Sequence, residues 1–348
     1  MRLRRLPLLT FSLLLGAGCV SPPPYEDGTV RDDLNTAVDA VIKNGGLDGA
    51  ALIILDETGE TYRREVGNLD PNTPIRIASA SKWISAAVIM SVVESGRLDL
   101  GTKVGSVLPD YPPAVAEITL RQLMSHTSGI QPDLVLKQPR VASLDASARL
   151  IASAPLEGPP GSRFHYGGSS MQIAARMAEV ATGRTWQEIY SNALAEPLAV
   201  GGEWGHPLRE GDAVPYVAGG LRISMNDYLR FMAMFLGEGS LGGKRVLKPG
   251  TVRQIETDQL DGVTAIDRPS VVPGAWRYGM GVWCEAVRPD RSCSIVSSAG
   301  AFGVFPWIER DAQRAGLFFS QAPLPQVLPA ALRLRDLAKA LPPARSAR

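Results

Sequence analysis

The segment at residues 79–94 constrains the fold more than any other part of the chain, because its helical pattern is apolar on almost every side. Its apolar residues are Trp83, Ile84, Ala86, Ala87, Val88, Ile89, Met90, Val92 and Val93. A helix of this kind is buried on most of its faces, so other elements have to surround it. The chain has 348 residues, which is enough to build such a core as one large domain or two fused lobes.

Segments typical of strands lie near both ends of the chain, and helical patterns lie between them. Residues 50–55 and 61–66 flank a turn and indicate a hairpin. Four further short segments are rich in aromatic or β-branched residues: 276–287, 294–298, 303–309 and 315–321. We therefore expect an α/β chain of the α+β type, with one antiparallel sheet assembled from both termini, flanking helices, and a mainly helical lobe inserted over about residues 80–270. The cleft between the lobes is the natural ligand site.

Composition excludes several classes of protein. The chain carries 36 basic and 35 acidic side chains and is 45% hydrophobic, which argues against general disorder and against a nucleic-acid partner. Three scattered histidines and the lack of a Cys-x-x-Cys pair argue against a His/Cys metal site. We expect neither a metal nor an organic cofactor.

Residues 1–19 have the pattern of an exported bacterial lipoprotein. Arg2, Arg4 and Arg5 precede an apolar stretch at residues 6–15 that is too short to span a bilayer, and small residues lead to Cys19. We expect a signal peptide at 1–19, a lipid anchor on Cys19, a tether at 20–30, a folded domain at 31–342 and a tail at 343–348. The protein would be held at a membrane of the cell envelope and face the periplasm. A plain secretory leader that contains a cysteine is the alternative.

Cys284 and Cys293 are the remaining cysteines, nine residues apart on either side of turn residues 288–291. Outside the cytoplasm such a pair can close a disulfide across a hairpin. Two buried free thiols are the alternative.

Ser79 and Lys82 begin the apolar segment at positions i and i+3, so on a helix they share one face. A serine hydroxyl needs a base to become a good nucleophile, and a desolvated lysine with a depressed pKa can be that base. A capped helix with a surface lysine is the alternative. Burial favours the catalytic interpretation, because an idle ammonium inside the most apolar helix would be costly.

Five blocks, in order along the chain, resemble the serine β-lactamase superfamily, in particular its class C-like and esterase branch that includes D,D-peptidases. They are residues 74–82 (PIRIASASK), 120–130 (LRQLMSHTSGI, similar to LLTHTSGL), 161–166 (GSRFHY) followed by 195–198 (AEPL), 219–224 (GGLRIS) with Asp227, and 300–303 (GAFG) through residues 307–308. The resemblance covers about residues 30–340 and implies the fold of β-lactamases and transpeptidases.

The resemblance also implies roles for individual residues. Ser79 would be the nucleophile that accepts the acyl group, Lys82 its base partner, and Tyr166 the phenol that relays protons to the leaving group. The backbone N–H groups of Ser79 and of Ala301, on an edge strand, would form the oxyanion hole. A packing aromatic beside Phe164 is the alternative for Tyr166.

Two positions depart from the family pattern. The family's Tyr-x-Asn is here Tyr166-Gly167-Gly168, and its late Lys or His before x-Gly is here Ser298-Ala299-Gly300. Gly168, Ser298 and Gly300 would then border the substrate in a less positive cleft. This favours a neutral ester over an anionic β-lactam or a peptide carboxylate.

His126 raises the alternative of a Ser-His-Asp hydrolase, but the chain lacks a Gly-x-Ser-x-Gly elbow. We expect His126 to support the helical lobe. The sequence thus predicts a serine hydrolase of ester, amide or β-lactam substrates, most of all an esterase acting through an acyl-enzyme at Ser79. A β-lactamase or D,D-peptidase is one alternative, and a weak or silent cell-envelope binding protein of the same fold is the other.

Overall fold

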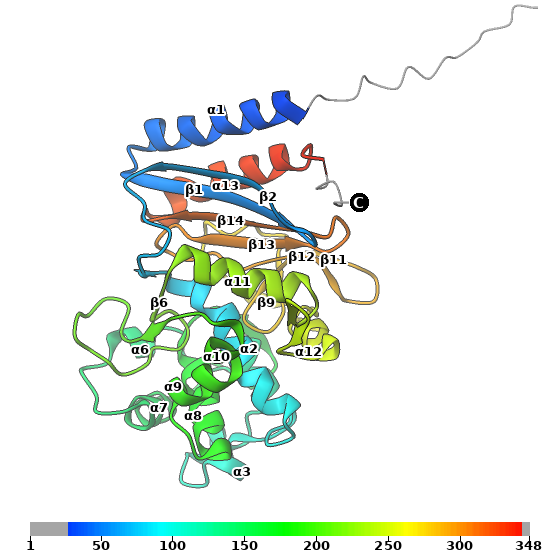
Figure 1. Ribbon diagram of the computed structural model, residues 1–348. Helices are drawn as coiled ribbons and strands as arrows, with labels where there is room; N and C mark the ends of the chain where they lie inside the picture. The colour runs from blue at the N-terminus through cyan, green and yellow to red at the C-terminus, as the bar shows by residue number, and fades with distance from the viewer. Residues whose placement is uncertain (1–26, 343–348) are drawn as a thin grey trace, which may run out of the picture.

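A computed structural model describes residues 27–342 (Figure 1). The predicted signal peptide, Cys19 and the tail lie outside these residues. The predicted tether at 20–30 overlaps the first helix, α1 (Asp27–Gly45), so folded structure begins before residue 31, where the domain was predicted to start. Val30, inside this overlap, is buried in the core.

A seven-stranded antiparallel sheet forms the centre of the molecule. Its order is β10 (Arg277–Tyr278), β11 (Trp283–Val287), β12 (Cys293–Ser297), β13 (Phe305–Glu309), β14 (Arg314–Ser320), β1 (Gly49–Asp56) and β2 (Gly59–Gly67). β1 pairs directly with β14, so the two ends of the chain meet inside one sheet, as predicted. The inner residues of β1 are buried, which explains why its sequence is a continuous apolar run.

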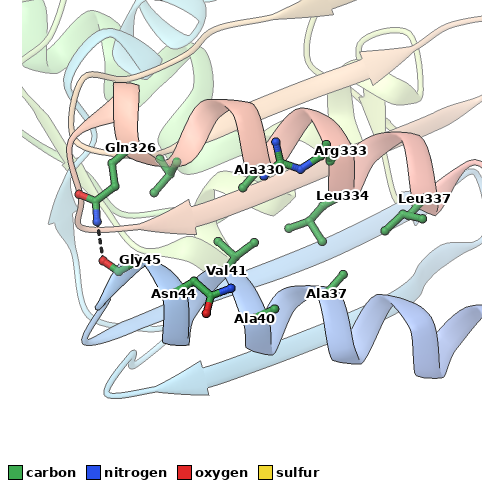
Figure 2. A pocket seen from close by; sticks show the side chains of 11 residues that line it. Ala37, Ala40, Val41, Asn44, Gly45, Gln326, Ala330, Arg333, Leu334 and Leu337 are labelled. Atoms are coloured by element: carbon green, nitrogen blue, oxygen red, sulfur yellow. Dashed lines mark hydrogen bonds between the residues drawn. The ribbon is translucent and has the colours of Figure 1, made fainter.

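Two helices from the opposite ends of the chain cover one face of the sheet (Figure 1). They are α1 and α13 (Leu324–Ala338), which pack against each other and share an apolar core with that face. Figure 2 shows the groove of about 460 Å³ between them, lined by Ala37, Val41, Leu334 and Leu337, with Gln326 donating a hydrogen bond to the Gly45 carbonyl.

The apolar helix predicted at residues 79–94 packs on the other side of the sheet. α2 (Ser81–Glu94) is buried along most of its length and packs with α11 (Met225–Leu236) and α12 (Pro249–Ile255) in the main core. Ser79 is not part of α2. It lies in a single 3₁₀ turn, η1 (Ala78–Ala80), directly before it.

The helical lobe lies beyond α2, on the side away from α1 and α13 (Figure 1). It contains α3 (Val104–Val107), α4 (Pro113–Ala116), α5 (Leu120–Met124), α6 (Leu134–Lys137), α7 (Leu144–Ala152), α8 (Ser169–Thr182), α9 (Trp186–Tyr190), η2 (Ser191–Ala195) and α10 (Glu196–Leu198). The described residues also form three small sheets: β3 (Ile75–Arg76), β6 (Leu221–Ile223) and β5 (Glu203–Trp204); β4 (Arg163–His165) with β9 (Ala265–Asp267); and β7 (Ser240–Leu241) with β8 (Lys244–Arg245).

The segment at residues 276–287 was predicted as one strand but forms two, β10 and β11. The chain turns between them at Gly281, which has a φ of 73°. A Cβ atom there would lie 2.5 Å from the carbonyl oxygen of Lys82, so this turn packs directly against the start of α2. Among residues 27–342, no helix is both long and apolar enough to cross a membrane.

Candidate active site

The turn that carries Ser79 is held on two sides. The Ile77 N–H donates to the Leu221 carbonyl of β6 at 3.2 Å, and the Ser81 hydroxyl donates to the Ala78 carbonyl at 2.6 Å. Ala78 has a φ of 46°, a conformation that is strained for a residue with a side chain. The surrounding contacts therefore maintain a backbone shape that presents Ser79, half-buried, at the base of a pocket.

Lys82 lies one turn further along and is only 2% exposed. Its Nζ atom is 2.9 Å from Ser79 Oγ and donates a second hydrogen bond to the Ala218 carbonyl, also at 2.9 Å. Burial lowers the pKa of Lys82 from 10.5 to about 7, although the nearby Asp133 carboxylate opposes the shift. A substantial share of Lys82 is therefore a neutral amine near pH 7, and its lone pair can accept the Ser79 proton.

Tyr166 follows β4 and lies beside Lys82, with its ring centroid 4.7 Å from Nζ. Its ring stacks on Trp283 at a centroid distance of 4.9 Å. Burial raises the pKa of Tyr166 strongly, while hydrogen bonding with Ser79 lowers it by less. The phenol is therefore protonated at neutral pH, which suits a proton donor better than a base. The structure thus brings Ser79, Lys82 and Tyr166 together.

His126 is buried behind Tyr166, with ring centroids 5.3 Å apart. Its Nδ1 lies 3.0 Å from Ser170 Oγ and its Nε2 lies 3.1 Å from Tyr278 Oη. Burial holds the pKa of His126 well below 6.5, so the ring is neutral. Because both ring nitrogens are occupied by hydroxyl groups rather than by a carboxylate and Ser79, His126 supports the tyrosine and does not form a Ser-His-Asp triad.

Ala301 lies in the turn between β12 and β13, not on an edge strand as predicted. The Gly303 N–H donates to the Gly300 carbonyl at 2.9 Å and closes this turn. Within the part of the chain that the structure describes, the N–H groups of Ser79 and Ala301 donate to no backbone carbonyl. Both residues line the same pocket, so both N–H groups are available to a ligand there.

The pocket above Ser79 has a volume of about 470 Å³. Its walls are mainly apolar or aromatic, including Leu136, Tyr166, Tyr216, Val272, Trp283 and Leu324. Lys82 and Asp133 are the charged residues that line it. Within the described residues, no three His, Cys, Asp or Glu side chains gather as metal ligands.

Gly168, predicted to border the substrate, does not line the pocket. A Cβ atom on Gly168 would lie 2.0 Å from the Tyr216 hydroxyl oxygen, so the Tyr216 phenol occupies the space that a larger residue would need. Tyr216 borders the pocket instead. Sequence reasoning missed it. The signal available was the unexplained glycine after Tyr166, which implies a bulky neighbour from elsewhere in the chain.

Ser298 and Gly300 were also predicted to border the substrate, and neither is among the residues that line this pocket. The Ser298 hydroxyl is buried and donates to the Ser79 carbonyl at 3.1 Å. A Cβ atom on Gly300 would lie 2.1 Å from the Ile77 carbonyl oxygen. Both residues therefore contact the backbone of the turn that carries Ser79.

Ser298→Ala tests a positioning role for the Ser298 hydroxyl. We expect kcat for the predicted ester hydrolysis at Ser79 to fall about fivefold, with little change in KM. This is the equivalent of one hydrogen bond of about 1 kcal/mol. Ser298→Thr keeps the hydroxyl and should restore most of the rate. Steady-state kinetics measure both variants, and an unchanged kcat in Ser298→Ala would contradict the role.

Cys284 and Cys293 form a disulfide, with their Cα atoms 5.3 Å apart. The bridge joins β11 to β12 next to Trp283, the residue on which Tyr166 stacks. The predicted disulfide is therefore confirmed at these two positions, and the alternative of two free thiols there is wrong.

Several known proteins are similar to this chain in sequence and fold. A family model described as Beta-lactamase matches residues 34–340. The chain is 28% identical to penicillin-binding protein 4 of Amycolatopsis lactamdurans, over 70% of this chain and 74% of the relative. It is 28% identical to esterase EstB of Burkholderia gladioli, over 48% of this chain and 49% of that esterase. The crystal structure of a beta-lactamase-like protein from Bacteroides dorei DSM 17855 matches with a TM-score of 0.76 at 32% identity, and covers 83% of this chain and 90% of that one.

Proposed function

Because the chain belongs to the beta-lactamase family, whose fold is that of a serine hydrolase superfamily, we propose that it forms an acyl-enzyme at Ser79 and acts mainly as an esterase on a small or neutral acyl substrate. One observation carries this proposal. Lys82 is almost fully buried, its Nζ lies 2.9 Å from Ser79 Oγ, and burial lowers its pKa to about 7. Burying a lysine costs folding stability, and a lysine whose pKa lies near 7 is suited to take a proton from the serine.

The proposed reaction has two halves. Ser79 Oγ attacks the ester carbonyl and its proton passes to neutral Lys82, while the N–H groups of Ser79 and Ala301 bind the oxyanion. The bond from the acyl carbon to the alcohol oxygen then breaks. Tyr166, protonated at neutral pH, donates a proton to the departing alkoxide and regains one from the Lys82 ammonium. In the second half water attacks the acyl-enzyme by the same route, which releases the carboxylic acid and regenerates Ser79.

The pocket disfavours an anionic substrate. Its lining charges are one lysine and one carboxylate, so it holds no pair of cations to clamp an anionic group. Ser298 occupies the position of the family's cation. Its hydroxyl donates a hydrogen bond to the Ser79 carbonyl instead. The similarity to esterase EstB supports an esterase activity.

A β-lactamase or D,D-peptidase is the second candidate, and similarity to penicillin-binding protein 4 favours it. Against it stands Gly168, where the family's asparagine is replaced and where Tyr216 leaves no room for a side chain. A silent binding protein is the third candidate. The convergence of Ser79, Lys82 and Tyr166 argues for activity. On sequence alone, we also propose that the protein is exported and lipid-anchored through Cys19.

The test uses purified protein with p-nitrophenyl butyrate, a chromogenic cephalosporin and a fluorophosphonate, each beside Ser79→Ala. We expect ester hydrolysis and phosphonylation of Ser79, located by peptide mass spectrometry, and the loss of both in the variant. Faster turnover of the cephalosporin than of the ester would favour the second candidate. Absence of labelling and of turnover would leave only the binding protein.

A further inference from the structure

Asp133 is an exposed residue at the edge of the Ser79 pocket whose carboxylate has no structural task. It directly precedes α6, but its side chain accepts no capping hydrogen bond from that helix. Within residues 27–342, no ion pair or hydrogen bond joins its carboxylate to another residue, and Lys137, one turn further along, does not reach it. A carboxylate of this kind remains free to interact with whatever enters the pocket.

The electrostatic influence of Asp133 reaches the floor of the pocket. Its negative charge raises the pKa of three buried groups there, Lys82, Tyr166 and Tyr216. Asp133 and these three residues line one pocket, so its charge acts where a ligand would bind. At pH 8 most of Lys82 is neutral because burial lowers its pKa to about 7, and Asp133 is then the main formal charge in the pocket.

The remaining walls suit a cation as well. The aromatic rings of Tyr216 and Trp283 line the same pocket, while the Tyr166 ring is already in contact with Trp283 and with Lys82 Nζ. Ring faces attract cations by roughly 0.5–1 kcal/mol even where water has access. An ammonium group would therefore meet both a free carboxylate and aromatic surfaces, whereas a carboxylate group on the substrate would meet repulsion.

We propose that Asp133 determines substrate specificity, by favouring acyl substrates that carry an ammonium group and disfavouring those that carry a carboxylate. This inference rests on the proposed esterase function and refines it: among the small esters that the site would accept, those with an ammonium group would react faster than neutral ones, and those with a carboxylate more slowly. The selection acts through the charge of the substrate, in its acyl part or its alcohol part, while the reaction at Ser79 is unchanged.

The experiment compares isosteric esters that differ in one charge, at pH 8 and low salt. On the acyl side the probes are p-nitrophenyl esters with a trimethylammonium, a tert-butyl or a carboxylate end. On the alcohol side they are butyrylthiocholine and its neutral 3,3-dimethylbutyl thioester. In at least one of the two series we expect kcat/KM to be about three- to fivefold higher for the cationic than for the neutral ester. This corresponds to the stabilisation that a solvent-exposed ion pair contributes.

The variants separate charge from structure. Asp133→Asn should bring the cation-to-neutral ratio of kcat/KM close to one, and Asp133→Lys should reverse the order of cationic and anionic esters. Asp110→Asn removes an exposed carboxylate that does not line the pocket and should keep the wild-type ratio. Salt should weaken the preference, because the carboxylate is exposed.

The outcomes distinguish the two proposals. If neutral esters are hydrolysed through Ser79 but the ratio stays the same in Asp133→Asn, or if wild type prefers the anionic ester, the specificity proposal is overturned and the esterase proposal stands. If no ester is turned over, the esterase proposal fails. The rates at which a cationic and a neutral phosphonate label Ser79 then still measure the charge preference, and equal rates would overturn it.

Discussion

Lys82→Met should nearly abolish activity and at the same time make the protein more stable at pH 7. Loss of the base at Ser79 should lower kcat/KM by about 10³-fold, within the range for general-base catalysis. A pKa that falls from 10.5 to about 7 in the folded state costs at most about 5 kcal/mol of stability. Methionine removes that cost but leaves the Ala218 carbonyl without its donor, so we expect a net gain of about 2–3 kcal/mol. Urea unfolding and ester kinetics measure the two effects.

The dependence on pH identifies the cause of the gain. The unfolded chain protonates Lys82 below about 10.5, whereas the folded chain does so only below about 7. Between these values the unfolded state binds more protons, so wild-type stability rises with pH; below pH 7 the cost is constant. The advantage of Lys82→Met should therefore be full at pH 7 and shrink towards pH 10. Lys103→Met, at an exposed lysine paired with Glu117, should show neither effect. A variant that is less stable than wild type at pH 7 would contradict the assignment.

The fold could be predicted from the sequence where local patterns and burial agree. The strands that became β1, β12, β13 and β14 are short and apolar or aromatic, and α2 is apolar around its circumference. Boundaries set by tertiary contacts were less predictable. Gly281 splits a predicted strand because the turn there packs on the Lys82 carbonyl, and the predicted tether overlaps α1, where Val30 is buried in the core.

The candidate site also contains residues that local sequence could predict and residues that depend on tertiary contacts. The spacing of Ser79 and Lys82 places them together within one turn, so local geometry was enough to pair them. Tyr166 comes from a distant segment, and only the family resemblance pointed to it. Family positions do not fix where a side chain points. The Ser298 hydroxyl donates a hydrogen bond to the Ser79 carbonyl. The Tyr216 phenol, from 48 residues later in the sequence, fills the space beside Gly168.

Gly300→Ala should disable the oxyanion hole without touching any reacting side chain. The new Cβ atom would lie 2.1 Å from the Ile77 carbonyl oxygen and 3.3 Å from the Ala80 nitrogen. Both atoms belong to the backbone around the Ser79 turn, which is held by β6 and cannot move aside cheaply. The turn that carries Ala301 should therefore shift away. We expect kcat to fall by about 10²-fold, the usual cost of one oxyanion donor, while KM changes less.

Gly274→Ala is the matched control, because a Cβ atom on Gly274 meets nothing within 4 Å, and it should keep wild-type kcat. Circular dichroism and a thermal melt show whether Gly300→Ala still folds. The rate at which a fluorophosphonate labels Ser79 then shows which part of the site has failed. Phosphonylation also places an oxygen in the oxyanion hole, so labelling should slow together with ester turnover. A folded Gly300→Ala protein with wild-type kcat would mean that the Ala301 N–H is not the second donor, because the contact between Gly300 and Ile77 is what places that N–H beside Ser79.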